Sequence, residues 1–220
     1  MTDFNYNWHH NVSLMPYREK GIFPSEGYLL ALLHTLTKGE FIIESGVKNG
    51  GSTEIWLRAL RCPVYSIDHA PIKKYVLDRL QFIAGEFFSS FTFIPADAFD
   101  AIIYLDDKKT FNRSGTLFID GPKNQEAIDL ANHAVENCTE TKFNLIAIHD
   151  YQDDLSKIEG YHRIVKSRDI YTKWDNKQID SCVIPPYIGK YPHGPGIAIW
   201  IREDILTQEL VDCFNTELGF

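Results

Sequence analysis

The stretch from Glu40 to Thr53 constrains the fold of this chain more than any other part. It reads E-F-I-I-E-S-G-V-K-N-G-G-S-T, so a short apolar run and an acidic residue lead into a glycine-rich turn. The Ser-Thr pair at its end opens an amphipathic segment. This order predicts a buried strand, a tight turn and a helix. Backbone N–H groups at the start of such a helix can bind a carboxylate or a phosphate, and glycine lets a ligand approach closely.

The turn matches neither of two well-known nucleotide-binding loops. No Gly-Lys-Ser/Thr follows it, which argues against a P-loop, and the pattern G-x-G-x-x-G does not occur in it. From the turn alone, a tight strand-to-helix connection that binds nothing is an equal alternative.

Patterns typical of strands and helices alternate along most of the chain. A first helix is expected to begin after Pro24 and to end near Lys38. The alternation that follows predicts a parallel sheet with helices on both faces. The predicted strands are residues 41–44, 63–68, 90–94, 115–120 and 143–149, and the predicted helices are residues 52–61, 72–84, 98–105 and 125–137.

The last third of the chain has a different pattern. We expect a helix at residues 161–174 and a polar helix at residues 205–218. Residues 181–185 and 196–202 are predicted strands, and the short loop between them leaves no room for a crossover helix, so they should pair antiparallel. Residues 1–24 are interpreted as an N-terminal arm or cap, and residues 25–220 as a single α/β domain.

The composition bears mainly on partners and location. The formal net charge of −8, with basic residues clustered only in pairs, argues against a nucleic-acid substrate. The sequence has no run of about 18 apolar residues and its N-terminus does not resemble a signal peptide, so we expect a cytoplasmic protein without a membrane partner. The four cysteines lie far apart, which favours reduced thiols over a disulfide framework or a zinc site.

Three motifs together resemble a known family. They are E-S-G-x-x-x-G-x-S-T at residues 44–53, I-D-G-P-K at residues 119–123 and H-D at residues 149–150. Over about residues 25 to 203 the chain resembles the class I S-adenosylmethionine-dependent methyltransferases, especially their small-molecule O-methyltransferase branch and a poorly characterised subgroup. The resemblance implies a Rossmann-like fold. Its seven-stranded, mostly parallel sheet would have the order 3-2-1-4-5-7-6, with helices on both faces and an antiparallel C-terminal hairpin.

The same resemblance implies a binding site for S-adenosylmethionine at the ends of the first four strands. Asp68 ends the second strand about 22 residues beyond Gly46, where a carboxylate can accept ribose hydroxyls, although it could instead cap a turn or helix. Asp97 follows the third strand and would contact the adenine or only cap the next helix. Lys48 departs from the family pattern, in which a small or neutral residue is commoner. The implied cofactor-binding residues are Glu44, Ser45, Gly46, Gly50, Gly51, Ser52, Thr53, Asp68, His69, Asp97, Ala98 and Asp120.

Asp120 and Asp150 follow neighbouring predicted strands, at the edge where open α/β sheets carry their chemistry. In the metal-dependent branch of the family, acidic residues at these places bind Mg²⁺. After the fifth strand that branch has two neighbouring ligand residues, and in this chain the first of them is His149. This weakens the prediction of a Mg²⁺ site, because an imidazole ligand suits Mn²⁺ better. Three interpretations stay open for Asp120, His149 and Asp150: a divalent metal site (Mg or Mn), a general base at His149 that a carboxylate orients, or a simple loop cap. His193, in Y-P-H-G-P-G, is a second candidate base. Lys123, three residues after Asp120, either pairs with an acidic substrate or with Asp120 itself, or is a surface residue at the start of a helix.

The resemblance therefore predicts an enzyme that methylates a hydroxyl of a small polar molecule, such as a sugar or natural product. One alternative is a metal-dependent hydroxylase of the cephalosporin-hydroxylase type, and another is a non-catalytic cofactor-binding module. The expected partner is a small-molecule acceptor, with a homodimer as a further expectation.

Overall fold

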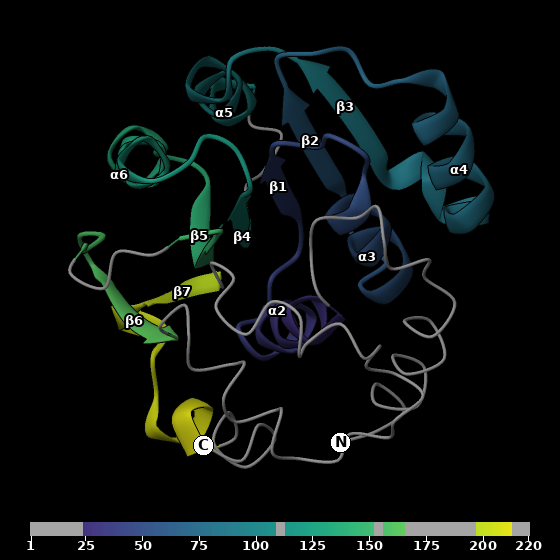
Figure 1. Ribbon diagram of the computed structural model, residues 1–220. Coiled ribbons are helices and arrows are strands. Elements are labelled where there is room, and N and C mark those ends of the chain that lie inside the picture. The colour runs from purple at the N-terminus through teal and green to yellow at the C-terminus, as the bar shows by residue number, and fades with distance from the viewer. Residues whose placement is uncertain (1–23, 109–112, 152–155, 166–196, 213–220) are drawn as a thin grey trace, which may run out of the picture.

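A single seven-stranded sheet forms the centre of the molecule in the computed structural model, which describes residues 24–108, 113–151, 156–165 and 197–212 (Figure 1). The strand order is β3-β2-β1-β4-β5-β7-β6, so the predicted order is confirmed. The strands are β1 (Ile42–Ser45), β2 (Val64–Asp68), β3 (Phe91–Pro95), β4 (Ser114–Ile119), β5 (Lys142–His149), β6 (Tyr161–Val165) and β7 (Ile197–Arg202).

The first five strands run parallel to one another, and of the last two only β7 runs in the opposite direction. Parallel registers join β3 to β2, β2 to β1, β1 to β4 and β4 to β5. Strand β7 then pairs antiparallel with both β5 and β6. Because the five parallel strands point the same way, their carboxyl ends meet along one edge of the sheet.

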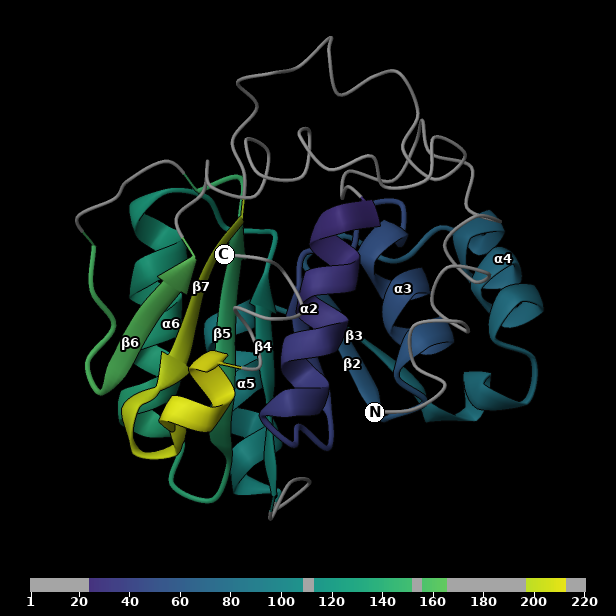
Figure 2. The same cartoon turned by 90° about the horizontal axis from the view of Figure 1, so that it is seen from below.

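Helices cover both faces of the sheet, as the alternating pattern predicts (Figure 2). Side chains of successive strand residues point to opposite faces, so Ile42 packs with one helix layer and Ile43 with the other. The first layer contains α2 (Pro24–Leu36), α3 (Gly51–Ala59) and α4 (Lys74–Ala84), and the second contains α5 (Ala98–Asp107) and α6 (Gln125–Asn137). Short 3-10 helices η2 (Gly85–Ser90) and η4 (Glu203–Ile205) precede β3 and follow β7.

One predicted element is wrong. Residues 161–165 form the edge strand β6 instead of the start of a helix over residues 161–174. The segment Y-H-R-I-V combines an aromatic residue with two β-branched ones, and these favour a strand when a free sheet edge is available. Here β7 offers that edge, so pairing with a distant strand decides the conformation.

The predicted partner of the last strand is also wrong. Both sides of β7 are taken, one by β5 and the other by β6, so no position beside it remains for residues 181–185. Those residues, residues 1–23 of the predicted arm and residues 166–174 lie outside the described parts of the chain. The predicted C-terminal helix is described only over its first part, at residues 208–212. Within the described ranges, every helix is too short or too polar to cross a bilayer.

A buried histidine joins α2 to the sheet. His34 is 3% exposed, and its Nδ1 lies 2.8 Å from the Oγ1 of Thr116 on β4. Burial lowers the pKa of His34 to about 4, although a hydrogen bond with the backbone of Gly39 opposes the change. The ring is therefore neutral in the folded protein at neutral pH.

We expect the free energy of unfolding to decrease less on acidification in His34→Gln than in the wild type. The folded pKa is below the ordinary value of 6.5, so the neutral ring stabilises the fold fully above that pH and the contribution is lost as the pH falls towards 4. The shift corresponds to about 3 kcal/mol at most. Urea unfolding at about pH 7 and about pH 4.5 should show a loss some 2–3 kcal/mol smaller in the variant than in the wild type. The exposed His162→Gln is the matched control, and equal losses in wild type and His34→Gln would contradict the assignment.

Candidate functional site

A cavity of about 690 Å³ lies at the carboxyl ends of the parallel strands. Residues at the ends of β1 and β2 line it, together with residues that follow β3, β4 and β5. The described lining is Ser45, Gly46, Val47, Lys48, Asn49, Ser52, Ile67, Asp68, His69, Ala96, Asp97, Ala98, Phe99, Asp120, Gly121, Pro122, Lys123, Glu126 and Asp150. The cavity is thus large enough for a small-molecule ligand and combines apolar walls with many polar groups.

The glycine-rich turn after β1 needs its glycines at two points. Gly46 has a φ of 90°, and a Cβ built on it would lie 2.7 Å from the backbone nitrogen of Gly121. Gly50, the N-cap residue of α3, has a φ of 69°. Lys48 also adopts a positive φ, 46°, without being glycine. The two glycines let the turn pass close to the end of β4 and still enter the helix.

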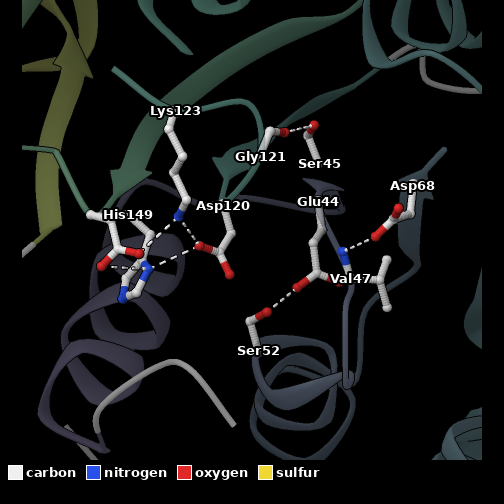
Figure 3. Close-up of polar contacts among 10 residues, drawn as sticks. Glu44, Ser45, Val47, Ser52, Asp68, Asp120, Gly121, Lys123 and His149 are labelled. Carbon is white, nitrogen blue, oxygen red and sulfur yellow. Dashed lines mark hydrogen bonds and ion pairs between the residues drawn. The ribbon is translucent and has the colours of Figure 1, made fainter. Parts of the chain in front are cut away.

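A buried carboxylate beneath this turn holds its two sides together. Glu44 is 0% exposed, and its oxygens accept hydrogen bonds from four side chains (Figure 3 shows the one from Ser52). The other donors are the Thr53 hydroxyl at 2.6 Å, the Trp56 indole at 3.2 Å and the Ser66 hydroxyl at 2.6 Å. Burial raises the pKa of Glu44, and these donors oppose the rise. Glu44 therefore joins β1 to β2 and to the first two turns of α3, and it does not line the cavity.

Glu44→Gln should destabilise the protein although the side-chain volume hardly changes. An amide would place N–H donors against groups that already donate, and the Trp56 indole cannot reverse its role. We expect a loss of about 1–3 kcal/mol in the free energy of unfolding, measured with urea. Glu86→Gln, at an exposed position, is the control and should change it little. Equal stability of Glu44→Gln and wild type would rule out the structural role.

Asp68, at the end of β2, holds the outer side of the turn. Its Oδ2 accepts from the backbone N–H groups of Val47 at 2.9 Å and Lys48 at 3.2 Å, and its Oδ1 from that of Ala70 at 3.1 Å (Figure 3 shows Val47). Burial favours a higher pKa for Asp68, but these backbone donors and the nearby His69 outweigh it, so the pKa is lowered. Asp68 is thus ionised, and Oδ1 has room for a further donor from the cavity.

Helix α4 supports the same turn from behind. The Arg79 guanidinium donates to the backbone oxygen of Asn49 and lies 3.6 Å from the buried carboxylate of Glu54 on α3. The hydroxyl of Tyr75 donates to the Asn49 side chain at 3.3 Å. Two helices therefore fix the position of a turn whose other side faces the cavity.

Asp97 and His69 form another wall of the cavity. Asp97 caps α5, since its side chain accepts from the backbone N–H of Phe99 at 2.8 Å. Its other carboxylate oxygen lies 3.5 Å from His69 Nε2. The helix-cap alternative for Asp97 is therefore observed, and its carboxylate lines the cavity as well.

Asp120, His149 and Asp150 converge where β4 and β5 end (Figure 3 labels Asp120 and His149). His149 Nδ1 lies 2.9 Å from Asp120 Oδ1 and 3.5 Å from Asp150 Oδ1. Asp150 has a φ of 58°, a conformation that Asp tolerates better than most residues. His149 itself is only 3% exposed, whereas both carboxylates line the cavity.

Lys123 completes this cluster. Its Nζ lies 2.5 Å from Asp120 Oδ1 and 3.0 Å from Asp150 Oδ2. Burial would lower the pKa of Lys123, but the two carboxylates outweigh it and raise the pKa. Burial also acts to raise the pKa of Asp150, while His149 and Lys123 lower it to about 2. Both partners of this ion pair are therefore charged.

The cluster offers a poor fit for a divalent metal. Potential ligand atoms of Asp120, His149 and Asp150 lie within 4.8 Å of one another, which suits an ion. However, the ammonium of Lys123 already bonds to oxygens of both carboxylates, and a dication beside it would be repelled. The metal interpretation of these three residues therefore stays a prediction, which their spacing favours and the Lys123 ammonium opposes.

The structure brings most of the predicted site residues to one cavity. Those that line it are Ser45, Gly46, Ser52, Asp68, His69, Asp97, Ala98, Asp120 and Asp150. Glu44, Gly50, Gly51 and Thr53 do not, because they shape the turn from beneath, and His149 lies behind Asp120. His193 falls outside the described residues.

Other lining residues were missed at the sequence level. Phe99 follows the predicted residue Ala98 directly, and Glu126 lies near the start of the helix that follows Asp120. No sequence motif marks either of them. Lys123 was not missed: its pairing with Asp120 was one of the interpretations left open by the sequence, and the structure shows that pair.

No family model and no curated protein sequence matches this chain. Its fold is similar to that of solved structures. The cofactor-bound Rv0187 structure from MTB matches with a TM-score of 0.50 and 13% identity, over 92% of this chain and 91% of that chain. A Klebsiella pneumoniae protein classed provisionally as an O-methyltransferase matches with a TM-score of 0.54 and 13% identity, over 92% and 90%. An O-methyltransferase from Bacillus cereus in complex with SAH matches with a TM-score of 0.45 and 15% identity, over 92% of each chain, a likeness too weak to carry an argument.

The chain has the Rossmann-like class I methyltransferase fold. At 13% identity the comparisons establish this fold and no activity, because one fold can carry many functions. Within this methyltransferase fold, the cavity occupies the carboxyl edge of the sheet, where α/β proteins bind their ligands.

Proposed function

We propose that this protein is an S-adenosylmethionine-dependent methyltransferase that acts on a hydroxyl of a small polar molecule, such as a sugar or natural product. The single observation that carries the proposal is that the glycine-rich turn, Asp68 and the Asp120 cluster face one cavity. The turn and Asp68 suit a nucleoside with a charged amino-acid end, and the cluster suits a hydroxyl that must lose its proton.

The cofactor would occupy the part of the cavity beside β1, β2 and β3. Its amino-acid end would lie at the turn from Ser45 to Ser52, near the N-terminus of α3, whose dipole favours a carboxylate. Its ribose would donate to Asp68 Oδ1, while Oδ2 keeps its bonds to the turn. Asp97, His69 and Phe99 would then surround the adenine.

Asp68→Ala should weaken binding of S-adenosylhomocysteine by about 1–3 kcal/mol, the usual cost of an unpaired buried polar group. Since Asp68 also holds the turn, the ribose contact needs its own measurement. Calorimetry with S-adenosylhomocysteine and its 3′-deoxy analogue, on wild type and variant, gives a double-mutant cycle.

A coupling energy of about 1 kcal/mol or more between the ribose hydroxyl and Asp68 is expected. Asp78→Ala is the control, because Asp78 pairs with Lys74 on the surface of α4. If the affinity is the same in Asp68→Ala, or if the coupling is zero, Asp68 does not bind the ribose.

The acceptor would lie beside Asp120. In the reaction, a bond forms between the acceptor oxygen and the methyl carbon as the carbon–sulfur bond breaks, and S-adenosylhomocysteine leaves. Alignment of these atoms can supply up to about 7–11 kcal/mol. The hydroxyl proton needs an acceptor, and we assign this role to Asp120, a cavity-lining carboxylate with His149 bonded behind it. His149 would therefore stabilise and orient Asp120, the reverse of the order expected from the sequence.

Asp120→Asn should lower turnover by about 10²–10⁴-fold, the usual contribution of a positioned proton acceptor. Its affinity for S-adenosylhomocysteine should stay nearly unchanged, because Asp120 faces the acceptor. Release of S-adenosylhomocysteine from S-adenosylmethionine, measured with a panel of sugars and phenols, checks turnover. Asp129→Asn, on the exposed part of α6, is the control. An active Asp120→Asn enzyme would overturn this role.

The alternatives make different demands on the same residues. A hydroxylase of the cephalosporin-hydroxylase type would need a metal at Asp120 and Asp150, and the ammonium between them disfavours it. A non-catalytic module would bind the cofactor and give no turnover with any acceptor. The homodimer and the cytoplasmic location remain predictions.

A further inference from the structure

The pair of carboxylates at the ends of β4 and β5 needs a cation. Asp120 and Asp150 both approach the ring of His149, and two carboxylates that share a site repel each other unless a positive charge lies between them. A metal ion could supply this charge, and so could a side chain.

We propose that the Lys123 ammonium is the resident cation of this site, so that its acceptor half works without a divalent metal. Lys123 Nζ lies 2.5 Å from one oxygen of Asp120 and 3.0 Å from one oxygen of Asp150 (Figure 3 labels Lys123 and Asp120). These are charge-assisted hydrogen bonds at the distances expected for an ammonium with two carboxylates. Lys123 is thereby a positioning residue that fixes both acids.

The chain path holds Lys123 in this place. The residues just before it are tied to β1, because the N–H groups of Asp120 and Gly121 both donate to the Ser45 oxygen, at 2.8 and 3.0 Å. The Ser45 hydroxyl in turn donates to the Gly121 carbonyl (Figure 3). Helix α6 begins at Gln125, just after Lys123. The lysine is thus anchored on both sides, and its side chain is 40% exposed along the cavity wall.

The charge balance favours an arrangement in which Lys123 stays bonded to both carboxylates over one in which a divalent metal displaces it. One ammonium offsets one of the two carboxylate charges, and His149 contributes a ring nitrogen at 2.9 Å from Asp120. A divalent ion would have to expel a charged group from two ion pairs and then lose its own water shell, which Mg²⁺ does reluctantly. An ammonium has three N–H donors, and the two carboxylates use two of them, so the third can face a ligand oxygen in the cavity.

This inference rests on the proposed function only in calling this part of the cavity the acceptor side. It can be tested without turnover, because metal binding is measured directly. The protein is treated with a chelator, dialysed and titrated with Mn²⁺, while the signal of free Mn²⁺ is followed by electron paramagnetic resonance. The variants are Lys123→Met, which keeps most of the side-chain volume without the charge, and Lys74→Met as the control. Lys74 pairs with Asp78 on the surface of α4, far along the chain from the cluster.

The wild type and Lys74→Met should leave Mn²⁺ free, whereas Lys123→Met should bind one equivalent at least tenfold more tightly. Adding Asp150→Asn to Lys123→Met should abolish the acquired site. Lys123→Gln provides a second variant if the first does not fold, as judged by circular dichroism. A wild-type protein that binds one Mn²⁺ tightly, and loses it in Asp120→Asn, would overturn the proposal. So would folded Lys123 variants that gain no metal.

The outcomes also separate this inference from the proposed function. A wild type that binds no S-adenosylhomocysteine would contradict the methyltransferase proposal and leave the Mn²⁺ comparison interpretable. A wild type that binds S-adenosylhomocysteine and also Mn²⁺ would contradict only the role of Lys123.

Discussion

The buried carboxylate of Glu44 is the constraint on which the rest of the site depends. A carboxylate removed from water is costly unless donors surround it, and here three hydroxyls and one indole do so. Those donors come from β2 and from the first two turns of α3, so satisfying one side chain fixes two strands and a helix relative to each other. The spacing of eight and nine residues between Glu44 and the Ser52-Thr53 pair is what lets the chain leave β1, turn and return to the same carboxylate. The floor of the cavity follows from that geometry.

The acceptor side is organised by charge. Asp120, Asp150, His149 and Lys123 come from the ends of two neighbouring strands and the loop between β4 and α6, and none of them is close to the others in sequence except Asp120 with Lys123 and His149 with Asp150. Their distances show a lysine between two carboxylates and a histidine behind one of them. An arrangement of this kind holds a proton acceptor in place with fixed charges of the chain itself.

Most of the fold was predictable because apolar runs and helical stripes alternate so regularly, and the strand order came with the family resemblance. The errors lie where long-range pairing overrides local pattern: residues 161–165 become a strand because β7 offers an open edge. At the site, sequence motifs located the right segments but could not separate residues that face the cavity from those beneath it. Glu44 and Thr53 are part of the motif but hydrogen-bond to each other beneath the turn instead of facing the cavity. The contact between Lys123 and Asp150 could not be inferred from the sequence, because only the fold brings these two residues together.

The support of the glycine-rich turn by α4 has a consequence for how a ligand is received. Arg79 holds the Asn49 carbonyl from behind, Tyr75 holds its side chain, and Asp68 holds the backbone of the next two residues towards β1. A loop fastened at so many points has little conformational freedom left to lose on association. The ligand therefore meets a preformed surface, and differences in affinity between related ligands should appear in how fast they leave more than in how fast they arrive.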